Sequence, residues 1–530
     1  MSKNKKALTP EEKFEVVRQM LESCHLMTGN NNSVIITLPI DGGFRRVSIE
    51  SKDFNTYVSH KFRKTTGKIL PDKIVEEVKK DLYYKQFQKD TSETNFRIKR
   101  IGDTVYYDLN DKLLQYVKID ENGWEILEGN TDYFSYNPIE TEQVVPKHGG
   151  DIDLLRKYVN FSDEGWILFK AYLVSCFYEG IQHPLMNVNG VWGSGKSTVA
   201  KLVKSLVDPA KHLLTDMPTA KKDFVVTLIS SYYMAFDNLS KLTPKQSDMI
   251  CKCITGGSAS FRELYTDMGL VNVSYDALVS MNGISDVITR GDLADRTLYF
   301  ESLIIDEDKR IPDSEFWKEF EKDKPYILGG IFDILSKAIS LYPTIQLKKI
   351  HRLGDFHKLG CAIAKAMSPE LESVFCKLLN DNKRKQLENT FDNTTMLRAT
   401  FDYLDIHEDN RYEGTVSQLY ASVKAFIKND CEDKYNLRLF PVADNAYGRK
   451  LKEYAQLCRE LGWDIYLHKS GNSYVEIKRA KDKSENTPTN EIVRKPIYFI
   501  RTPIITRKPI LTNKSAKVIY AAKEYKTNLA

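Results

Sequence analysis

Apolar and polar residues in the first 135 positions follow the short patterns of a small α+β domain. Thr9 as N-cap, Pro10 at the first helical position and Glu12 two residues later are typical of a helix start. The runs Ser33–Pro39 and Phe44–Ile49 flank Asp41-Gly-Gly43 and predict a hairpin. The other predicted elements are helices at Asp53–Lys64 and Asp72–Gln88 and strands at Arg97–Ile101, Thr104–Leu109, Leu113–Ile119 and Trp124–Leu127. We therefore predict an N-terminal α+β accessory domain over residues 1–135.

Four acidic residues of this domain were considered as metal ligands, namely Asp103, Asp108, Asp111 and Asp120. Turns favour Asp because its side chain bonds to nearby backbone groups, so we predict that these four are turn and surface residues. The stretch from Asn137 to Gly150 contains Pro and Gly without apolar periodicity, which predicts a linker.

Between residues 150 and 345, short apolar runs alternate with helical patterns, which is typical of an α/β domain. The predicted strands are Leu185–Val188, Tyr232–Phe236, Tyr275–Met281 and Thr297–Phe300, and the predicted helices include Thr198–Val207, Lys222–Ser230, Phe316–Glu321 and Pro325–Leu341. Helical patterns continue through residues 346–410, which we predict to form a helical lid or connector.

The last part of the chain predicts a DNA-binding domain followed by a basic tail. Amphipathic helices at Gly414–Lys428 and Ala446–Leu461 precede a hairpin formed by Trp463–His468 and Ser473–Arg479, an arrangement typical of a winged helix over residues 411–480. The second helix leaves four basic residues for solvent, Arg449, Lys450, Lys452 and Arg459. They are predicted DNA contacts, with a solvated basic face as the alternative.

Charge and composition narrow the class of protein. The 530 residues are 42% hydrophobic and 28% charged, and no apolar run reaches the length of a membrane span. The net charge of +5 comes from residues 481–530, where eleven Lys/Arg face four Asp/Glu. This part, with four prolines and no periodicity, predicts a flexible polycation. The N-terminus shows no secretory signal, and the eight cysteines are scattered without zinc-knuckle spacing. We expect reduced thiols, a cytoplasmic location and no membrane contact.

The strongest single motif is Gly190-Val-Trp-Gly-Ser-Gly-Lys-Ser-Thr198, which fits G-x-x-x-x-G-K-[ST]. It lies between a predicted strand and a predicted helix, the position that such a loop needs to bind phosphate groups. We predict that Gly190, Gly193, Ser194, Gly195, Lys196, Ser197 and Thr198 bind ATP. Lys196 would neutralise the phosphates, and the Ser197 hydroxyl would bind Mg²⁺.

Three further positions are candidates for catalysis. An apolar strand ends in Asp237-Asn238, and Asp237 is the expected second ligand of Mg²⁺. The next apolar strand ends in Asn282, which could sense the γ-phosphate and orient water, or could be a turn residue before Gly283. Arg296 precedes a strand and could reach the ATP of a neighbouring subunit. Its alternative is a salt bridge to Asp292 or Asp295.

These motifs, in this order, together with Thr255-Gly-Gly257, Arg262 and His351-Arg-Leu-Gly-Asp-Phe356, resemble the ATPase core of replication helicases of phages and mobile elements. Such helicases include the superfamily III and D5-like primase-helicases and the replication initiators of staphylococcal islands. The resemblance implies an AAA+-like P-loop ATPase domain over residues 150–345 and a hexameric, ATP-driven motor that encircles DNA. It also implies Lys196, Asp237, Asn238, Asn282 and Arg296 as catalytic residues and Arg262, in a pore hairpin, as a DNA contact. Many such motors carry a second acid where this chain has Asn238, so the catalytic base stays open, with Glu263 as one candidate.

We expect an ATP-dependent DNA helicase or replication initiator of a mobile element in a bacterial host. Its expected partners are single-stranded DNA, an origin duplex, further copies of the chain and a primase or another replication protein. The alternative is a DNA-binding P-loop ATPase that acts as a regulatory or defence switch without unwinding. A small-molecule kinase fits poorly, because the winged helix and basic tail would have no role.

Overall fold

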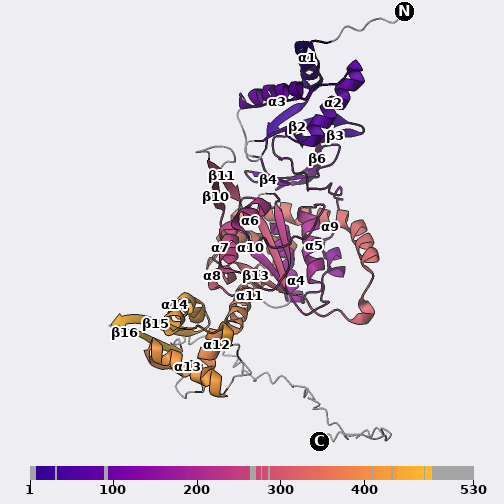
Figure 1. Cartoon of the computed structure of the whole chain (residues 1–530). Coiled ribbons are helices and arrows are strands. Elements are labelled where there is room, and N and C mark those ends of the chain that lie inside the picture. The colour runs from indigo at the N-terminus through magenta and orange to yellow at the C-terminus, as the bar shows by residue number, and fades with distance from the viewer. Residues whose placement is uncertain are drawn as a thin grey trace, which may run out of the picture. The chain divides into compact units, whose positions relative to one another are not determined.

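The computed structural model describes residues 8–29, 33–88, 94–228, 230–262, 270–275, 277–283, 287–406, 411–430, 435, 437–470 and 472–479. Figure 1 shows the helices and strands of these residues, coloured from the N-terminus to the C-terminus. The described residues form helices and five β-sheets, so the mixed multidomain α/β class predicted from the sequence is confirmed. The predicted basic tail over residues 481–530 lies outside the described residues.

The first three helices and a three-stranded sheet share a hydrophobic core of their own. The elements are α1 (Pro10–Leu21), β1 (His25–Thr28), β2 (Val34–Ile40), β3 (Gly43–Ser48), α2 (Lys52–Thr66) and α3 (Asp72–Phe87), with sheet order β1-β2-β3. The capping box expected at Thr9 and Glu12 forms, and β2 and β3 pair as the expected hairpin. Buried apolar residues from Val17 to Leu82 make up this core.

A second, antiparallel sheet shares its core with the rest of the chain. It comprises β4 (Ile98–Ile101), β5 (Thr104–Asp108), β6 (Gln115–Asp120) and β7 (Gly123–Glu128), in that order. The Tyr107 hydroxyl donates to the Leu206 carbonyl at 3.0 Å, and Trp124 Nε1 donates to Asp333 Oδ1 at 2.8 Å. The sheet therefore bonds directly to elements that come much later in the chain.

The predicted linker over residues 137–150 contains no helix or strand, and several of its residues are buried. Glu140 and Gln143 are buried, and Glu140 lies beside Arg97, which is itself fully buried. Arg97 lies 3.5 Å from Glu140 Oε2 and 3.6 Å from Asp208 Oδ1. Charged side chains can be buried in this way when they are paired and accompanied by hydrogen bonds.

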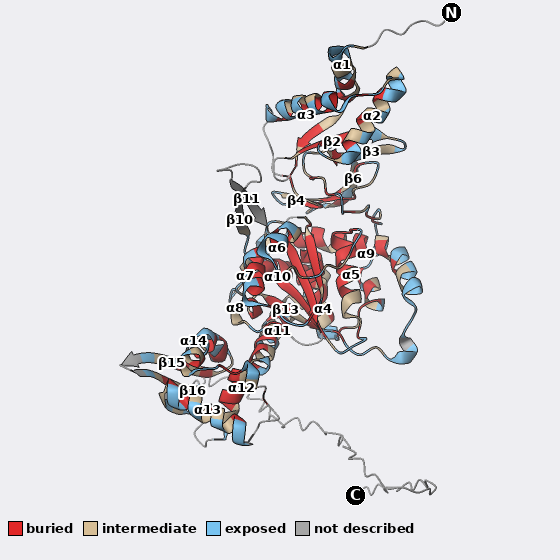
Figure 2. Ribbon diagram, in the orientation of Figure 1, coloured by how far each residue is buried: buried red, intermediate tan, exposed pale blue. Residues whose placement is uncertain are grey.

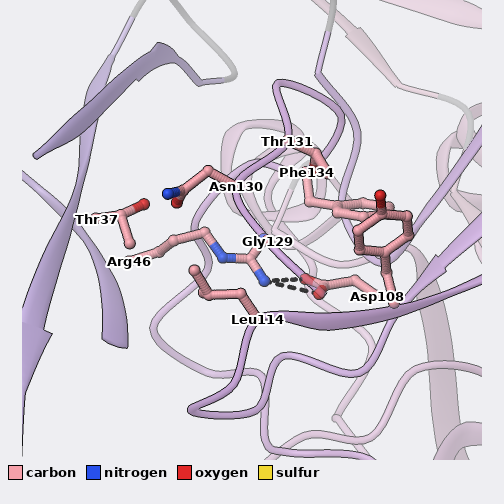
Figure 3. A pocket seen from close by; sticks show the side chains of 9 residues that line it. Thr37, Arg46, Asp108, Leu114, Gly129, Asn130, Thr131 and Phe134 are labelled. Atoms are coloured by element: carbon pink, nitrogen blue, oxygen red, sulfur yellow. Dashed lines mark hydrogen bonds and ion pairs between the residues drawn. The ribbon is translucent and has the colours of Figure 1, made fainter. Parts of the chain in front are cut away.

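Asp108 is another buried acid, which corrects its prediction as a surface residue, whereas its Oδ1 accepts the Asn110 N–H at 3.0 Å, as expected of a turn residue. It is 2% exposed and accepts two hydrogen bonds from Arg46 Nη2, at 2.7 and 2.6 Å. Figure 3 shows this ion pair in a small pocket that is also lined by Thr37, Asn130 and Phe134. The pair joins β3 to β5.

The central sheet is parallel, in the order β13-β8-β12-β9. Its strands are β8 (Leu185–Asn189), β9 (Tyr233–Leu239), β12 (Leu278–Gly283) and β13 (Thr297–Glu301). Figure 2 shows them as buried, and every residue of β8 and β12 is buried. The accompanying helices are α4 (Asp163–Ser175), α5 (Lys196–Val207), α6 (Lys221–Leu228), α7 (Pro244–Ile254) and α8 (Gly291–Ala294). A two-stranded hairpin, β10 (Gly257–Arg262) and β11 (Leu270–Tyr275), lies between α7 and β12 in the sequence.

Three long helices follow the sheet: α9 (Asp313–Leu341), α10 (Gly354–Met367) and α11 (Leu371–Asn393). The two helices predicted at Phe316–Glu321 and Pro325–Leu341 are one helix, with Pro325 inside it. A Cβ at Gly329 would lie 1.8 Å from the Lys147 carbonyl oxygen, so the chain entering this domain packs directly on the helix backbone. Such backbone contact and the burial of α9 outweigh the helix-breaking tendency of proline.

The last described elements are α12 (Thr395–Asp405), β14 (Tyr412–Thr415), α13 (Val416–Asp430), α14 (Asp444–Glu460), β15 (Trp463–Ser470) and β16 (Asn472–Arg479). The sheet order is β14-β16-β15. The two helices and the hairpin expected here are confirmed, α12 lies in the predicted helical region of residues 346–410, and the structure adds the short strand β14. Short 3-10 helices occur at Ile152–Lys157, Glu307–Lys309, Tyr342–Thr344 and Leu437–Leu439. Among the described residues no helix has the length and apolar character to cross a membrane.

Candidate phosphate-binding site

The loop between β8 and α5 holds two glycines in conformations that other residues rarely adopt. Gly193 and Gly195 have φ values of 72° and 85°, in the left-handed region that glycine enters without a Cβ clash. Gly195 is the N-cap of α5, so the helix begins directly at the loop. The first N–H groups of a helix have no partner within it and favour negative charge. The loop therefore ends in a local anion-binding arrangement.

Gly190 is required for a different reason, the close approach of the chain after β13. A Cβ at Gly190 would lie 2.5 Å from the Ser302 carbonyl oxygen and 2.7 Å from Ser194 Oγ. Ser302 N–H donates to the Asn189 carbonyl at 2.8 Å, and its hydroxyl donates to the Ser194 carbonyl. Ser302 thus ties both ends of the loop together.

Lys196, the first residue of α5, closes over the loop. Its Nζ donates to the carbonyl oxygens of Gly190 and Val191, at 2.9 and 2.7 Å. Burial lowers the pKa of Lys196, and Asp237 partly opposes this effect. Ser197 and Thr198 follow it on α5 and are partly buried. The lysine charge is therefore held at the loop by weak acceptors that a phosphate group could replace.

Asp237 is the centre of a small polar cluster at the carboxyl ends of the parallel strands. Its Oδ1 accepts hydrogen bonds from Ser197 Oγ and from Asn282 Nδ2, both at 2.7 Å. Asp237 lies on β9 and Asn282 on the neighbouring strand β12, which lies between β9 and β8. Because parallel strands end at the same edge of a sheet, the fold brings these residues from distant sequence positions to the loop.

Asn238 contributes through its backbone. It has a φ of 54°, in the left-handed region that Asn tolerates better than most residues, and its side chain is exposed. Its N–H donates to Asn282 Oδ1 at 3.0 Å, which fixes the orientation of the Asn282 amide. Glu263, considered as a base, lies outside the described residues.

The Arg296 side chain contacts Asp292 of the same subunit, which is the alternative to a role in a neighbouring subunit. Its Nη1 donates to the Asp292 carbonyl at 2.6 Å and lies 3.9 Å from Asp292 Oδ2. The side chain is only 12% exposed. Asp295 is instead paired with Arg352 and Lys383. Arg296 could reach a neighbouring subunit only after leaving Asp292.

The structure places a different arginine, which the sequence did not single out, at the loop. Arg310 follows the short helix after β13, and a Cβ at Gly193 would lie 3.4 Å from its Nη2 and 3.9 Å from its Cζ. Arg310 is exposed, and its side chain has no hydrogen bond or ion pair within the described part of the chain. Ile305, in the same segment, lies near Gly195. No local pattern marks this segment, because its proximity to the loop depends on the path of the chain after β13.

The predicted DNA contacts lie away from this cluster in the sequence and in different elements. Arg262 is the last residue of β10, in the hairpin position expected for it, and its side chain is not described. On α14, all four predicted basic residues, Arg449, Lys450, Lys452 and Arg459, are exposed. Arg459 lies 3.6 Å from Asp464 Oδ1, whereas the other three have no ion pair within the described residues. Their exposure agrees with either DNA binding or a solvated face.

A comparison with protein families agrees with the motifs in indicating a replication protein of a mobile element. Residues 152–382 match the family described as actinomycete integrative conjugative element replication protein. This match covers less than half of the chain and supports a replication protein of a mobile element as its class. No curated protein matches the chain.

Solved structures give a weaker likeness. The A form apo structure of the NrS-1 C-terminal region has a TM-score of 0.39 and 11% identity, covering 89% of this chain and 100% of that one. The apo structure of the NrS-1 C-terminal region has a TM-score of 0.37 and 11% identity, covering 90% and 100%. Likeness at this level gives no basis for transferring a fold or a function.

Proposed function

We propose that this protein is an ATP-dependent DNA helicase or replication initiator of a mobile element, working as a ring of identical subunits. The observation that carries the proposal is the convergence of Lys196, Ser197 and Asp237 at a glycine-rich loop and a helix N-terminus. The family match over residues 152–382 supports replication as the process. ATP and Mg²⁺ are the proposed substrate and cofactor.

The residues present fit a magnesium ion. Ser197 Oγ and Asp237 Oδ1 lie 2.7 Å apart. Neighbouring ligands in an octahedral Mg²⁺ shell with bonds of 2.0–2.1 Å lie about 2.9 Å apart, so both oxygens can serve as ligands with little movement. Bound there, the ion would neutralise charge on the β- and γ-phosphates of ATP.

Lys196 and Arg310 supply positive charge from two sides of the loop. Lys196 would exchange its carbonyl partners for phosphate oxygens, a stronger, charge-assisted bond. Arg310 lies beside Gly193 of the same subunit, so we assign it to the nucleotide bound by its own loop. We still propose that Arg296 contacts the ATP of a neighbouring subunit, which requires its bond to Asp292 to break.

Asn282 would position the water that attacks the γ-phosphate. Its Nδ2 bonds to Asp237 and its Oδ1 accepts the Asn238 N–H, so the amide orientation is fixed by both neighbours. An amide can orient water but cannot accept its proton at neutral pH. Neither Asn238 nor Asn282 is therefore proposed as the group that accepts the proton of this water.

The region from α12 to β16 is proposed to be a winged helix that holds DNA through α14. Its order of helix, strand, two helices and hairpin matches that class, and α14 presents an exposed basic surface. Hydrolysis at the loop would then be coupled to movement on DNA.

ATP hydrolysis by purified protein tests the site, with Lys201→Ala as the matched control. Lys201 lies on the same helix, is partly buried and has no ion pair within the described residues. Lys196→Ala should abolish hydrolysis in a folded protein, because a charge against the phosphates is worth several kcal/mol of barrier. Lys201→Ala should keep it. Normal turnover by folded Lys196→Ala would rule out the assignment of the loop.

A further inference from the structure

Helices α10 and α11 bring together three side chains that commonly bind metal ions. His357 and Cys361 lie four residues apart on α10 and so share one face, and Cys376 lies on α11. Cys361 Sγ lies 3.2 Å from Cys376 Sγ, which lies 3.6 Å from His357 Nε2. All three ligand atoms lie within 4.8 Å of one another. The sequence spacing predicted no zinc knuckle, but spacing rules miss ligands that come from two packed helices.

These distances are close to those of a tetrahedral zinc site. With Zn–S bonds of about 2.3 Å and Zn–N bonds of about 2.0–2.1 Å, sulfur and nitrogen ligands lie about 3.6 Å apart and two sulfurs about 3.8 Å apart. The Cys376–His357 separation agrees with the first value. The two sulfurs lie about 0.6 Å closer than the second value, a difference that small side-chain rotations remove.

A second histidine lies next to the cluster, and its ring has no hydrogen-bond partner among the described residues. His351, just before α10, has both ring nitrogens buried and unpaired within the described part of the chain. Its ring centroid lies 6.2 Å from that of His357. A buried polar group without a partner destabilises the fold, and a metal bond would remove this cost. His351 is therefore placed to be a fourth ligand after a ring rotation.

Burial favours the neutral form of both imidazoles, which is the form that binds a metal ion. Burial lowers the pKa of His351 to about 4 and also lowers the pKa of His357. Burial raises the pKa of Cys361, so a bound metal must displace the thiol proton, which soft divalent ions do readily. The backbone N–H of His351 donates to His357 Nδ1 at 3.3 Å. Metal binding at His357 Nε2 places the ring proton on Nδ1. Nδ1 can then no longer accept a hydrogen bond, so this long bond would be lost and the metal bond would replace it.

We propose that His357, Cys361 and Cys376 bind one zinc ion, with His351 as the fourth ligand. The ion would join α10 to α11. The side chain of Asn382 on α11 accepts from the Tyr299 N–H at 3.0 Å and donates to the Tyr299 carbonyl at 2.6 Å, so α11 also supports β13. The ion has a structural role and is independent of the proposed helicase activity.

The test uses the full chain, purified with a thiol reductant and then freed of the reductant. Elemental analysis should find one zinc per chain after incubation with Zn²⁺ and removal of the excess. Co²⁺ in its place should give the intense visible absorption of a tetrahedral site and the near-ultraviolet bands of a thiolate ligand. Magnesium at the nucleotide loop produces neither signal, so failure of one site does not mimic failure of the other.

The variants Cys361→Ser and Cys376→Ser should lose the zinc, whereas Cys458→Ser should retain it. Cys458 is a matched control because it is buried on α14, outside the cluster. His351→Ala should weaken zinc binding by roughly tenfold or more. If a serine variant fails to fold, Co²⁺ titration of the wild-type chain still decides the question.

Three results would overturn the proposal. They are a reduced wild-type chain that binds no stoichiometric zinc, a Co²⁺ complex without thiolate bands, and zinc retained by the Cys361→Ser, Cys376→Ser double variant. A Cys361–Cys376 disulfide in a chain that binds no zinc after reduction would identify the pair as a thiol couple instead.

Discussion

Replacing Arg310 with alanine should weaken nucleotide binding and hydrolysis without disturbing the fold. The side chain is exposed and has no hydrogen bond or ion pair within the described residues, so nothing else in the fold depends on it. Its Nη2 lies 3.4 Å from the position of a Cβ on Gly193. The guanidinium therefore lies beside the loop, and a phosphate within about 4–6 Å of it would interact with it directly.

The size of the effect follows from this distance and from exposure. Two unit charges about 5 Å apart interact by about 3 kcal/mol at an effective dielectric constant of 20. Solvent screens an exposed pair, which reduces the contribution to about 1–2 kcal/mol. We therefore expect a loss of roughly 5- to 30-fold in ATP affinity, and a larger loss in turnover if charge grows on the γ-phosphate in the transition state.

The assay combines equilibrium binding with steady-state hydrolysis. Trp192, 78% exposed in the loop, is a fluorescence reporter of nucleotide binding. Lys318→Ala is the control for removal of an exposed cation, because Lys318 lies on α9 and has no ion pair within the described residues. Unchanged affinity and turnover in Arg310→Ala would refute the assignment.

Mixing variants tests whether Arg310 acts within its own subunit. A mixture of Arg310→Ala and Lys196→Ala chains should hydrolyse ATP no faster than the Arg310→Ala chains alone, because no subunit then carries both residues. A mixture of Arg296→Ala and Lys196→Ala chains should recover activity if Arg296 acts across the interface. Recovery in the Arg310 mixture would show that Arg310 also acts across the interface.

Three further predictions follow from the structure. Ser197→Ala and Asp237→Asn should each raise the Mg²⁺ concentration needed for half-maximal hydrolysis by roughly tenfold; an unchanged requirement would remove these residues from the metal shell. Burial raises the pKa of Glu140 to about 7, despite Arg97 nearby, so the folded protein holds a proton there that the unfolded chain releases above about pH 4.5. The bound proton stabilises the folded protein, and this contribution is lost as the pH rises towards and through 7. The temperature of thermal unfolding should therefore depend less on pH over this range in Glu140→Gln than in the wild-type chain. Equal pH dependence of the two chains would contradict this prediction. Truncation after Ala480 should weaken binding to all duplexes equally and flatten its salt dependence, whereas neutralising the four basic residues of α14 should reduce sequence preference; the reverse pattern would exchange the two roles.

The part of the site that could be predicted is the part set by local sequence or by strand ends. Glycine, lysine and serine spacing defines the loop, and an apolar strand ending in Asp237 predicts an acid at the same sheet edge as Ser197. This inference holds for any parallel sheet, because the carboxyl ends of all its strands lie at the same edge. Arg310 could not be found in this way, because the chain after β13 returns to the loop through contacts at Ser302 and Ile305.

Other differences have equally physical causes. Pro325 indicates a helix end by local propensity, but burial of α9 and its backbone contact near Lys147 hold one continuous helix. Pro and Gly content predicts a linker around Glu140, and the pairing of Glu140 with Arg97 accounts for the burial of this residue, which the linker pattern does not indicate. The ligands of the proposed zinc site are separated by the turn between α10 and α11, so only helix packing reveals them.

Strand displacement on a forked duplex tests the central claim most directly. ATP and Mg²⁺ should drive release of the displaced strand by the wild-type and Lys201→Ala chains, and Lys196→Ala should release none. Added single-stranded DNA should also raise the rate of hydrolysis. Hydrolysis and DNA binding without any strand release, on forks of either polarity, would contradict the helicase and favour a switch that does not unwind.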